Sequence, residues 1–197
     1  MANYDSLQHV FLIAMPHLKD PFFNQSVVYL WEYNEQGAKG VIINKPMKPH
    51  LGDLLRHLQI PIQDQRADDH PMLLGGPVAA DQGFLVQRKR DINLDTGKTE
   101  LRITVCSSKT DLLPLAEGEG LSDTLVVIGH AGWEAGQLDE ELKSNDWLVA
   151  PFNENTLFST LEDQSVNETA NTAYSWRDAA ATMGINLNNL SIEVGHA

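Results

Sequence analysis

Cysteine and basic residues are both scarce in this sequence. Cys106 is the single cysteine, so no disulfide can form within the chain, as is typical of proteins from a reducing compartment. Only 14 Lys and Arg stand against 27 Asp and Glu, which gives a formal net charge of −13 and a pI near 4.8. Because such a surface repels phosphates at long range, we do not expect direct binding to nucleic acid.

Long apolar runs are missing as well. No segment approaches the length of a membrane-spanning helix. The N-terminal stretch carries the acidic Asp5 where a signal peptide would have positive charge, and its apolar run, residues 10–15, is too short for one. We therefore expect a cytoplasmic protein with no membrane association.

The familiar cofactor and catalytic motifs are absent. Gly97-Lys98-Thr99 is similar to the end of a phosphate-binding loop, but Ile92 stands where that loop needs glycine, and a strand pattern follows instead of a helix. The sequence contains no G-x-S-x-G or H-E-x-x-H motif, and its seven histidines form no close pair. These absences predict neither a cofactor nor a metal site.

The patterns that are present predict one α+β domain over residues 1–197. A buried strand is expected at 10–15, and a hairpin joins strands at 26–33 and 38–46. The remaining predicted strands lie at 71–78, 83–88, 101–108, 124–130, 147–152 and 190–197. Helices are expected at 51–60, 110–118, 137–145 and 172–184, the second opened by a capping box of Ser108 and Asp111.

Three strand ends rich in glycine and proline are the candidate ligand loops. They carry Asn44-Lys45-Pro46, then Gly75-Gly76-Pro77, then Gly132, Trp133 and Gln137. If the three loops converge, Lys45 would supply charge and the glycines would let backbone approach a ligand closely.

The alternative is that each loop is a tight turn. Residues 129–136 would then be a corner between a strand and a helix, with Trp133 filling the core. The helix that follows begins with several acidic residues, which themselves complement the helix dipole. This favours the Lys45 and Gly76 region as the ligand site.

Four blocks of the sequence, taken together, resemble the bacterial AlgH/YqgE family. They are FLIAMPHLKDPFFNQSVVYLWEYNEQGAKGVIINKP, LLGGPVAADQGFLV, SSKTDLLPLAEGEG and IGHAGWEAGQLDEELKSNDWL. The resemblance implies a single α+β domain with a curled, bifurcated mixed sheet that forms a pseudo-barrel flanked by helices. The family is often labelled a transcriptional regulator, but no DNA-binding motif accompanies that label.

The sequence departs from the family pattern at two places. Relatives often have Cys-Glu-His where this chain has Trp31-Glu32-Tyr33, and they often have Tyr where it has His130. These departures weaken any mechanism that needs a thiol or an imidazole in the first hairpin, or one that needs His130.

Three functions are therefore considered. The first is a non-catalytic regulatory or binding protein, which holds a small ligand or a protein partner in a cleft near Asn44-Lys45-Pro46 and Gly75-Gly76-Pro77. The second is an enzyme acting on a small anionic substrate. Its candidate acid–base groups are Asp20, His17, Glu32 and Glu141, and its candidate nucleophiles are Ser26 and Cys106.

The third function is a transcriptional regulator, as the family label implies. Net charge disfavours direct DNA binding, and the one dense basic cluster, Arg88-Lys89-Arg90, is interpreted as a solvated strand end. For the second function, Cys106 sits in an alternating strand pattern, which favours a buried, inert thiol over a nucleophile.

Overall fold

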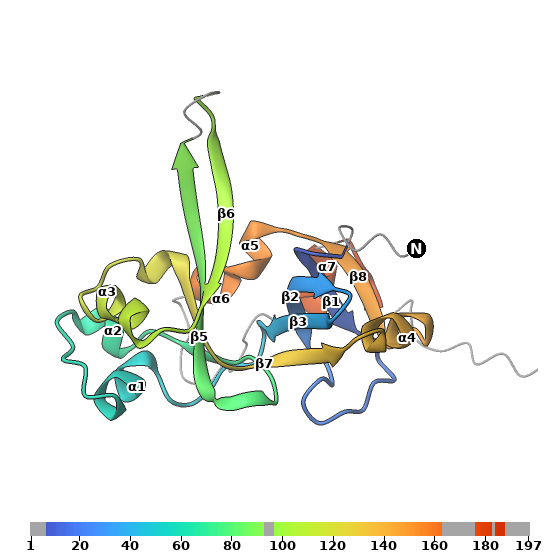
Figure 1. Ribbon diagram of the computed structural model, residues 1–197, viewed down its shortest axis with the longest axis horizontal. Helices are drawn as coiled ribbons and strands as arrows, with labels where there is room; N and C mark the ends of the chain where they lie inside the picture. Colours follow the sequence, from blue (N-terminus) through green and yellow to red (C-terminus); the bar gives the residue numbers. More distant parts are fainter. Residues whose placement is uncertain (1–6, 93–96, 163–175, 183, 188–197) are drawn as a thin grey trace, which may run out of the picture.

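A computed structural model describes residues 7–92, 97–162, 176–182 and 184–187 (Figure 1). The strand predicted at 190–197 lies outside these ranges. The described strands are β1 (Val10–Ala14), β2 (Val27–Asn34), β3 (Gly37–Ile42), β4 (Met72–Leu74), β5 (Val78–Ile92), β6 (Thr99–Cys106), β7 (Thr124–Glu134) and β8 (Trp147–Pro151). The α-helices are α1 (Leu51–His57), α2 (Gln65–Asp68), α3 (Leu112–Ala116), α4 (Gln137–Lys143), α5 (Glu154–Leu157), α6 (Ser159–Glu162) and α7 (Trp176–Thr182).

The strands form one mixed sheet in which β7 is the branch point. The order is β6-β5-β7-β3-β2-β1-β8, and β4 pairs with β7 from off this path. The first half of β7 pairs in parallel with β4 and antiparallel with β5, whereas the second half pairs with β3. The predicted α+β class is confirmed, and β7 is the strand at which the sheet bifurcates.

Strands β1 and β2 are buried on both faces, which explains their continuous apolar sequences. Phe11 and Tyr29 point into one core cluster, which α5 and α7 complete, while Leu12 and Leu30 point into another, which α4 covers through Leu138. A third cluster packs α1–α3 against β4, β5 and the first half of β7. Figure 1 shows β7 running from the α1–α3 end of the molecule to the end that holds β1–β3.

The predicted corner at residues 129–136 is wrong in its position. Strand β7 continues through this stretch to Glu134, and the turn comes only at Ala135 and Gly136, before α4. The strand continues because its residues 131–134 pair with β3. The glycine pattern predicted a turn because a single sequence does not show this partner strand.

Gly129 lies inside β7 with a φ of +70°, where the backbone of Gly76 reaches it. A Cβ on Gly129 would lie 2.3 Å from the carbonyl oxygen of Gly76, and a Cβ on Gly75 would lie 2.3 Å from the carbonyl oxygen of Gly129. The Gly75 amide also donates to the Ile128 carbonyl at 2.8 Å. These glycines therefore let two stretches of backbone touch where a side chain would separate them.

The prediction of a solvated basic cluster is wrong for Arg88, which is enclosed by partners. Its side chain is 13% exposed and bonds the carboxylates of Asp123 at 2.7 Å and Glu154 at 2.9 Å. The guanidinium also lies 4.8 Å from the centre of the Phe158 ring. Arg88 therefore connects β5 to α5 through its ion pair with Glu154. Lys89 and Arg90, by contrast, are exposed.

The helix predictions are mostly confirmed. Leu51 and Leu55 of α1 are buried, as the leucine spacing predicts. Ser108 and Asp111 form the expected capping box, but the segment that follows is one 3-10 turn and then the five-residue α3. Pro114 lies within α3, which agrees with a short helix at that point.

The first prediction concerns the glycine contact. Gly129→Ala should lower the free energy of unfolding by more than about 3 kcal/mol, because the new methyl group overlaps backbone and the residue has a positive φ. Urea unfolding followed by tryptophan fluorescence measures this difference.

Gly136→Ala is the matched control for this variant. Gly136 has a φ of +77°, but nothing lies within 4 Å of its would-be Cβ, so the loss should be only about 1–2 kcal/mol. Equal losses in the two variants would contradict the importance of the close approach.

The second prediction concerns pH. Burial lowers the pKa of His70, whose Nε2 lies 3.0 Å from the Thr124 carbonyl, and burial also lowers the pKa of His9 and of His130. Because the unfolded chain binds these protons more readily, stability is fully present above the unfolded pKa of about 6.5 and falls as the pH drops below it.

Urea unfolding midpoints measured between pH 8 and pH 5 report this effect. His70→Gln should reduce the dependence of the midpoint on pH. A pH profile that His70→Gln does not change would contradict the assignment.

Candidate functional site

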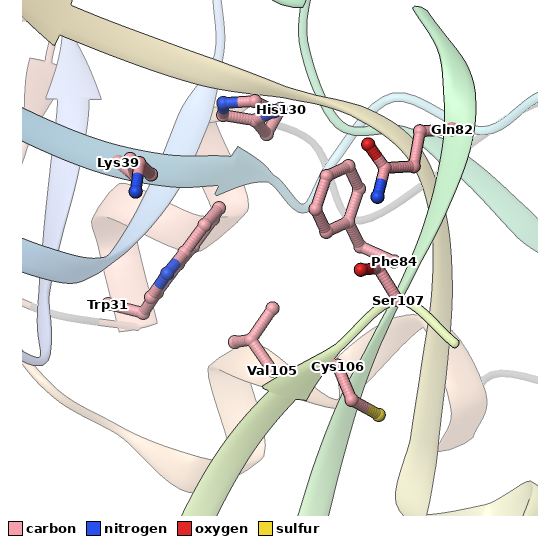
Figure 2. A pocket seen from close by; sticks show the side chains of 8 residues that line it. All are labelled: Trp31, Lys39, Gln82, Phe84, Val105, Cys106, Ser107 and His130. Atoms are coloured by element: carbon pink, nitrogen blue, oxygen red, sulfur yellow. The ribbon is translucent and has the colours of Figure 1, made fainter. Parts of the chain in front are cut away.

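A pocket of about 310 Å³ lies where β7 passes from β5 to β3. Figure 2 shows its side chains, which come from strands β2, β3, β5, β6 and β7 and from the residue after β6. They are Trp31, Lys39, Gln82, Phe84, Val105, Cys106, Ser107 and His130. The pocket therefore depends on how the sheet branches rather than on any single loop.

Three aromatic side chains form one wall of the pocket. The ring centroids of Phe84 and His130 lie 5.2 Å apart with the rings edge-on, and those of Trp31 and His130 lie 6.0 Å apart. Trp31 and Phe84 complete the group at 6.4 Å. All three side chains are half-buried, so each offers a ring surface to a bound molecule.

Two irregularities in the sheet direct side chains into this pocket. Leu30 pairs with Gly40 and Glu32 with Lys39, so Trp31 is an extra residue in a β-bulge of β2. The register between β5 and β7 also shifts between Val78 and Gly83, and Gln82 lies within that shift. Bulges of this kind commonly redirect side chains beside functional sites.

The glycine contact of the previous section places the third wall residue, His130. Its backbone follows Gly129 directly and pairs with Val78, and a Cβ on Gly76 would lie 2.3 Å from its carbonyl carbon. Loss of that close approach would move His130 relative to Trp31.

Electrostatics at the pocket leave His130 neutral at pH 7. Burial lowers the pKa of His130, the nearby Lys39 lowers it further, and Glu32 opposes both effects. Lys39 and Glu32 form an ion pair of 3.1 Å at the pocket rim. The Nδ1 atom of His130 is buried and has no hydrogen-bond partner among the described residues.

Cys106 lines the pocket but is a poor nucleophile. Burial, a hydrogen bond with Asp111 and the charge of Asp111 raise the pKa of its thiol to about 11, so it is protonated at pH 7. Its sulfur lies 3.8 Å from the Leu85 carbonyl oxygen and 3.8 Å from Gln87 Oε1. The thiol is partly exposed rather than buried, but the prediction of an inert thiol agrees with the raised pKa.

Two of the three predicted ligand loops, Asn44-Lys45-Pro46 and Gly75-Gly76-Pro77, contact each other through their backbones. The Leu74 amide donates to the Lys45 carbonyl at 2.8 Å, and the Ile42 amide donates to the Gly75 carbonyl at 2.8 Å. Pro46 forms an isolated bridge with Leu73, and Pro77 connects Gly76 to β5. These contacts fill the space around the glycines with other backbone.

Asn44 and Lys45 bind the loop before β2. The Asn44 side chain accepts from the Val27 amide at 2.8 Å and donates to the Gln25 carbonyl at 2.9 Å. The Lys45 ammonium donates to the Phe22 carbonyl at 2.5 Å, and burial lowers its pKa while Asp20 raises it. Both side chains therefore have structural partners, and their contact with a ligand stays a prediction.

Trp133 and Gln137 belong to a polar cluster centred on Glu141. The indole nitrogens of Trp133 and Trp147 each donate to Glu141 Oε2 at 2.7 Å, and Gln137 donates to Glu141 Oε1 at 2.9 Å. Trp133 is buried, as expected of a residue that fills the core. Gly132 lies closer to the pocket, since its would-be Cβ would be 3.8 Å from His130 Nε2.

The groups considered for catalysis are dispersed. His17 bonds Asp146 at 3.1 Å, Asp20 caps the amides of Phe22 and Phe23, and Glu141 holds the two indoles. Ser26 is fully buried, and its hydroxyl has no partner among the described residues. Of the six residues considered, only Cys106 lines the pocket.

None of the eight predicted ligand residues lines this pocket, although Gly76 and Gly132 lie beside His130. One feature of the sequence did point to this pocket. Trp31 and His130, at which the chain departs from the family pattern, are in ring contact in the folded protein.

Comparison with known proteins identifies the family. The AlgH-like family matches residues 11–188. The chain belongs to the AlgH-like family. A UPF0301 protein of Coxiella burnetii is 38% identical over 198 residues, covering 100% of both chains. One from Cronobacter sakazakii is 40% identical over 197 residues, covering 98% of this chain and 100% of that one.

Solved structures agree with this assignment. The solution structure of the AlgH protein of Pseudomonas aeruginosa is 36% identical, with a TM-score of 0.66 over 100% of this chain and 98% of that one. A crystal structure of a Corynebacterium diphtheriae protein has a TM-score of 0.65 over 98% and 95% of the two chains. At 19% identity, this second likeness supports the fold alone. In the described part of this AlgH-like chain, no helix is long and apolar enough to cross a membrane.

The third prediction concerns Glu141. Glu141→Ala should lower the free energy of unfolding by about 1–3 kcal/mol, because it leaves the indole N–H groups of two buried tryptophans without their acceptor. Glu140→Ala is the control: Glu140 is exposed and forms an ion pair with Lys143 at 2.6 Å, so the change should stay within about 0.5 kcal/mol. Equal urea midpoints for the two variants would contradict this role.

Proposed function

We propose that this AlgH-like protein is a non-catalytic binding protein, and that its ligand occupies the pocket between Trp31, Phe84 and His130. The observation that carries the proposal is the gathering of three aromatic rings around one open pocket. Ligand sites combine apolar and aromatic surface with a few polar groups that orient the ligand, and this pocket offers both kinds of side chain in equal number.

The chemistry of the lining supports binding more than catalysis. A neutral thiol and a neutral imidazole with a lowered pKa do not make an activated nucleophile and base. The pocket's cation, Lys39, is neutralised by Glu32. A small molecule with a flat unsaturated ring and a polar edge fits this lining, since the ring can stack on Trp31 while Gln82 and Ser107 offer hydrogen bonds.

The proposed ligand site lies beside, rather than within, the cleft predicted at Asn44-Lys45-Pro46 and Gly75-Gly76-Pro77. The two regions are joined by the Gly76 and His130 backbone contact. The protein would have a regulatory role if ligand binding in the pocket changed its affinity for a partner protein. Such a role does not require direct contact with DNA.

The fourth prediction tests this site. Native mass spectrometry of fresh protein should be followed by a thermal-shift screen of nucleotides, sugar phosphates and aromatic acids. A ligand at about 100 times its Kd stabilises the fold by about 2.7 kcal/mol, which is a shift of several degrees in Tm. Trp31→Ala should weaken binding of each hit at least about tenfold, since it removes the stacking surface.

Lys45→Ala is the matched comparison, because it removes the cation of the originally predicted cleft and leaves the pocket lining unchanged. Hits that Lys45→Ala abolishes and Trp31→Ala spares would overturn the proposed site in favour of the loops. An absence of hits together with an absence of co-purified ligand would contradict small-molecule binding.

A further inference from the structure

The charged group that lines the pocket is a cation. Among the eight described side chains of the lining, Lys39 alone carries a charge at pH 7, because the His130 imidazole and the Cys106 thiol are neutral there. Its ion-pair partner, Glu32, is not part of the lining. The Lys39 and Glu32 pair is therefore neutral as a whole, but it presents its positive end to the pocket.

The pairing of the strands produces this orientation. Lys39 lies in β3 between Glu32 of β2 and Gly132 of β7. Directly opposed residues of antiparallel strands share a face, so Glu32 flanks the Lys39 ammonium on the β2 side, at 3.1 Å. On the β7 side Gly132 has no side chain, and a Cβ there would lie 3.8 Å from His130 Nε2. The Lys39 side chain is therefore open towards His130, and it is 48% exposed.

Electrostatic effects at the His130 wall agree with this direction. Burial is the main cause of the lowered pKa of His130. After burial, Lys39 lowers this pKa more strongly than Glu32 raises it. Positive charge therefore prevails beside the His130 ring, although the two partners of the ion pair carry equal and opposite charges.

The Cys106 wall has the opposite sign. Burial is again the main cause of the raised thiol pKa, and Asp111 then raises this pKa more strongly than Lys89 lowers it. Figure 2 shows Cys106 and Lys39 on opposite sides of the pocket. The pocket is thus positive at its Lys39 end and negative at its Cys106 end.

We propose that the ligand of this pocket is a flat-ring acid, whose carboxylate pairs with the Lys39 ammonium while its ring stacks on Trp31. This inference rests on the function proposed above and specifies the chemical class of the ligand. A charge-assisted hydrogen bond between ammonium and carboxylate is stronger than a neutral one. Polar substituents on the far side of the ring then face Gln82 and Ser107, which Figure 2 shows across the pocket from Trp31.

The ion pair at the rim also sets how tightly such an acid binds. Both Glu32 carboxylate oxygens lie close to Lys39 Nζ, at 3.1 and 3.2 Å, so Glu32 shares the ammonium donors with the ligand and repels its carboxylate. The net charge of −13 acts over a longer range and is screened within about 8 Å at physiological salt. Aromatic rings also attract cations, but here Lys39 repels a cationic ligand from the lining.

The fifth prediction compares three probes that differ in charge: naphthoate, naphthamide and naphthylmethylammonium. In NMR titrations of the labelled protein, naphthoate should bind at least about tenfold more tightly than naphthamide, and the ammonium most weakly. Lys39→Met should remove the preference for naphthoate and leave the Kd of naphthamide unchanged. Glu32→Gln should tighten the binding of naphthoate about two- to fivefold, because it removes the competing carboxylate.

Lys143→Met is the matched control. Lys143 also forms an exposed ion pair, with Glu140 at 2.6 Å, but it does not line the pocket. This variant removes the same charge and should keep the preference for naphthoate. Because Glu32→Gln is expected to gain affinity, damage to the fold cannot imitate the predicted result.

Equal binding of naphthoate and naphthamide to the wild-type protein would overturn the anionic class. So would tighter binding of the ammonium, or a preference for naphthoate that Lys39→Met retains. In each of these cases, loss of binding in Trp31→Ala would still support the ring site itself. If none of the three probes binds, the ring site is contradicted together with the inference about its ligand.

Discussion

The close contact between the backbones of Gly76 and Gly129 is the constraint on which the rest of this structure depends. It lets the chain between β4 and β5 lie against β7 at the place where β7 leaves one pair of neighbours for another. Gly129 can turn there because a positive φ is available to glycine at little cost. Strand β7 therefore belongs to both parts of the sheet. It connects the end of the molecule that holds α1–α3 with the end that holds β1–β3.

The pocket is a consequence of that branching. A regular sheet would place alternate side chains on opposite faces, whereas the bulge at Trp31 and the register shift that includes Gln82 break the alternation beside His130. Three half-buried rings then surround a space that the regular core clusters do not fill. The glycine contact lies next to His130 in the chain, and His130 is in ring contact with Trp31.

Much of the fold could be predicted from the sequence, because it rests on local patterns. The apolar run from Val10 and the Gly37 hairpin are confirmed, and so is the leucine face of α1. What could not be predicted depends on partners distant in sequence. The sequence around Gly129 predicts a turn because it does not show that β3 pairs with the residues that follow. The sequence around Arg88 predicts a solvated side chain because it does not show the ion pair with Glu154.

The candidate site was harder to predict for the same reason. Glycine and proline mark where backbone bends or touches, and at Gly75 and Gly76 they mark contact with β7 rather than space for a ligand. A bulge has no signature in a single strand, so Trp31 could not be assigned to a pocket wall from its neighbours. The one sequence feature that distinguished Trp31 was its departure from the family pattern, and His130 departs from that pattern as well.

The most direct test of the central claim is an NMR titration of the isotope-labelled protein with a set of flat-ring compounds, followed through backbone amides and tryptophan indoles. The account predicts shifts that begin at the Trp31 indole and at His130 and weaken with distance from them. Shifts that instead centre on Phe22, Asn44 and Lys45, with the Trp31 indole unmoved, would contradict it.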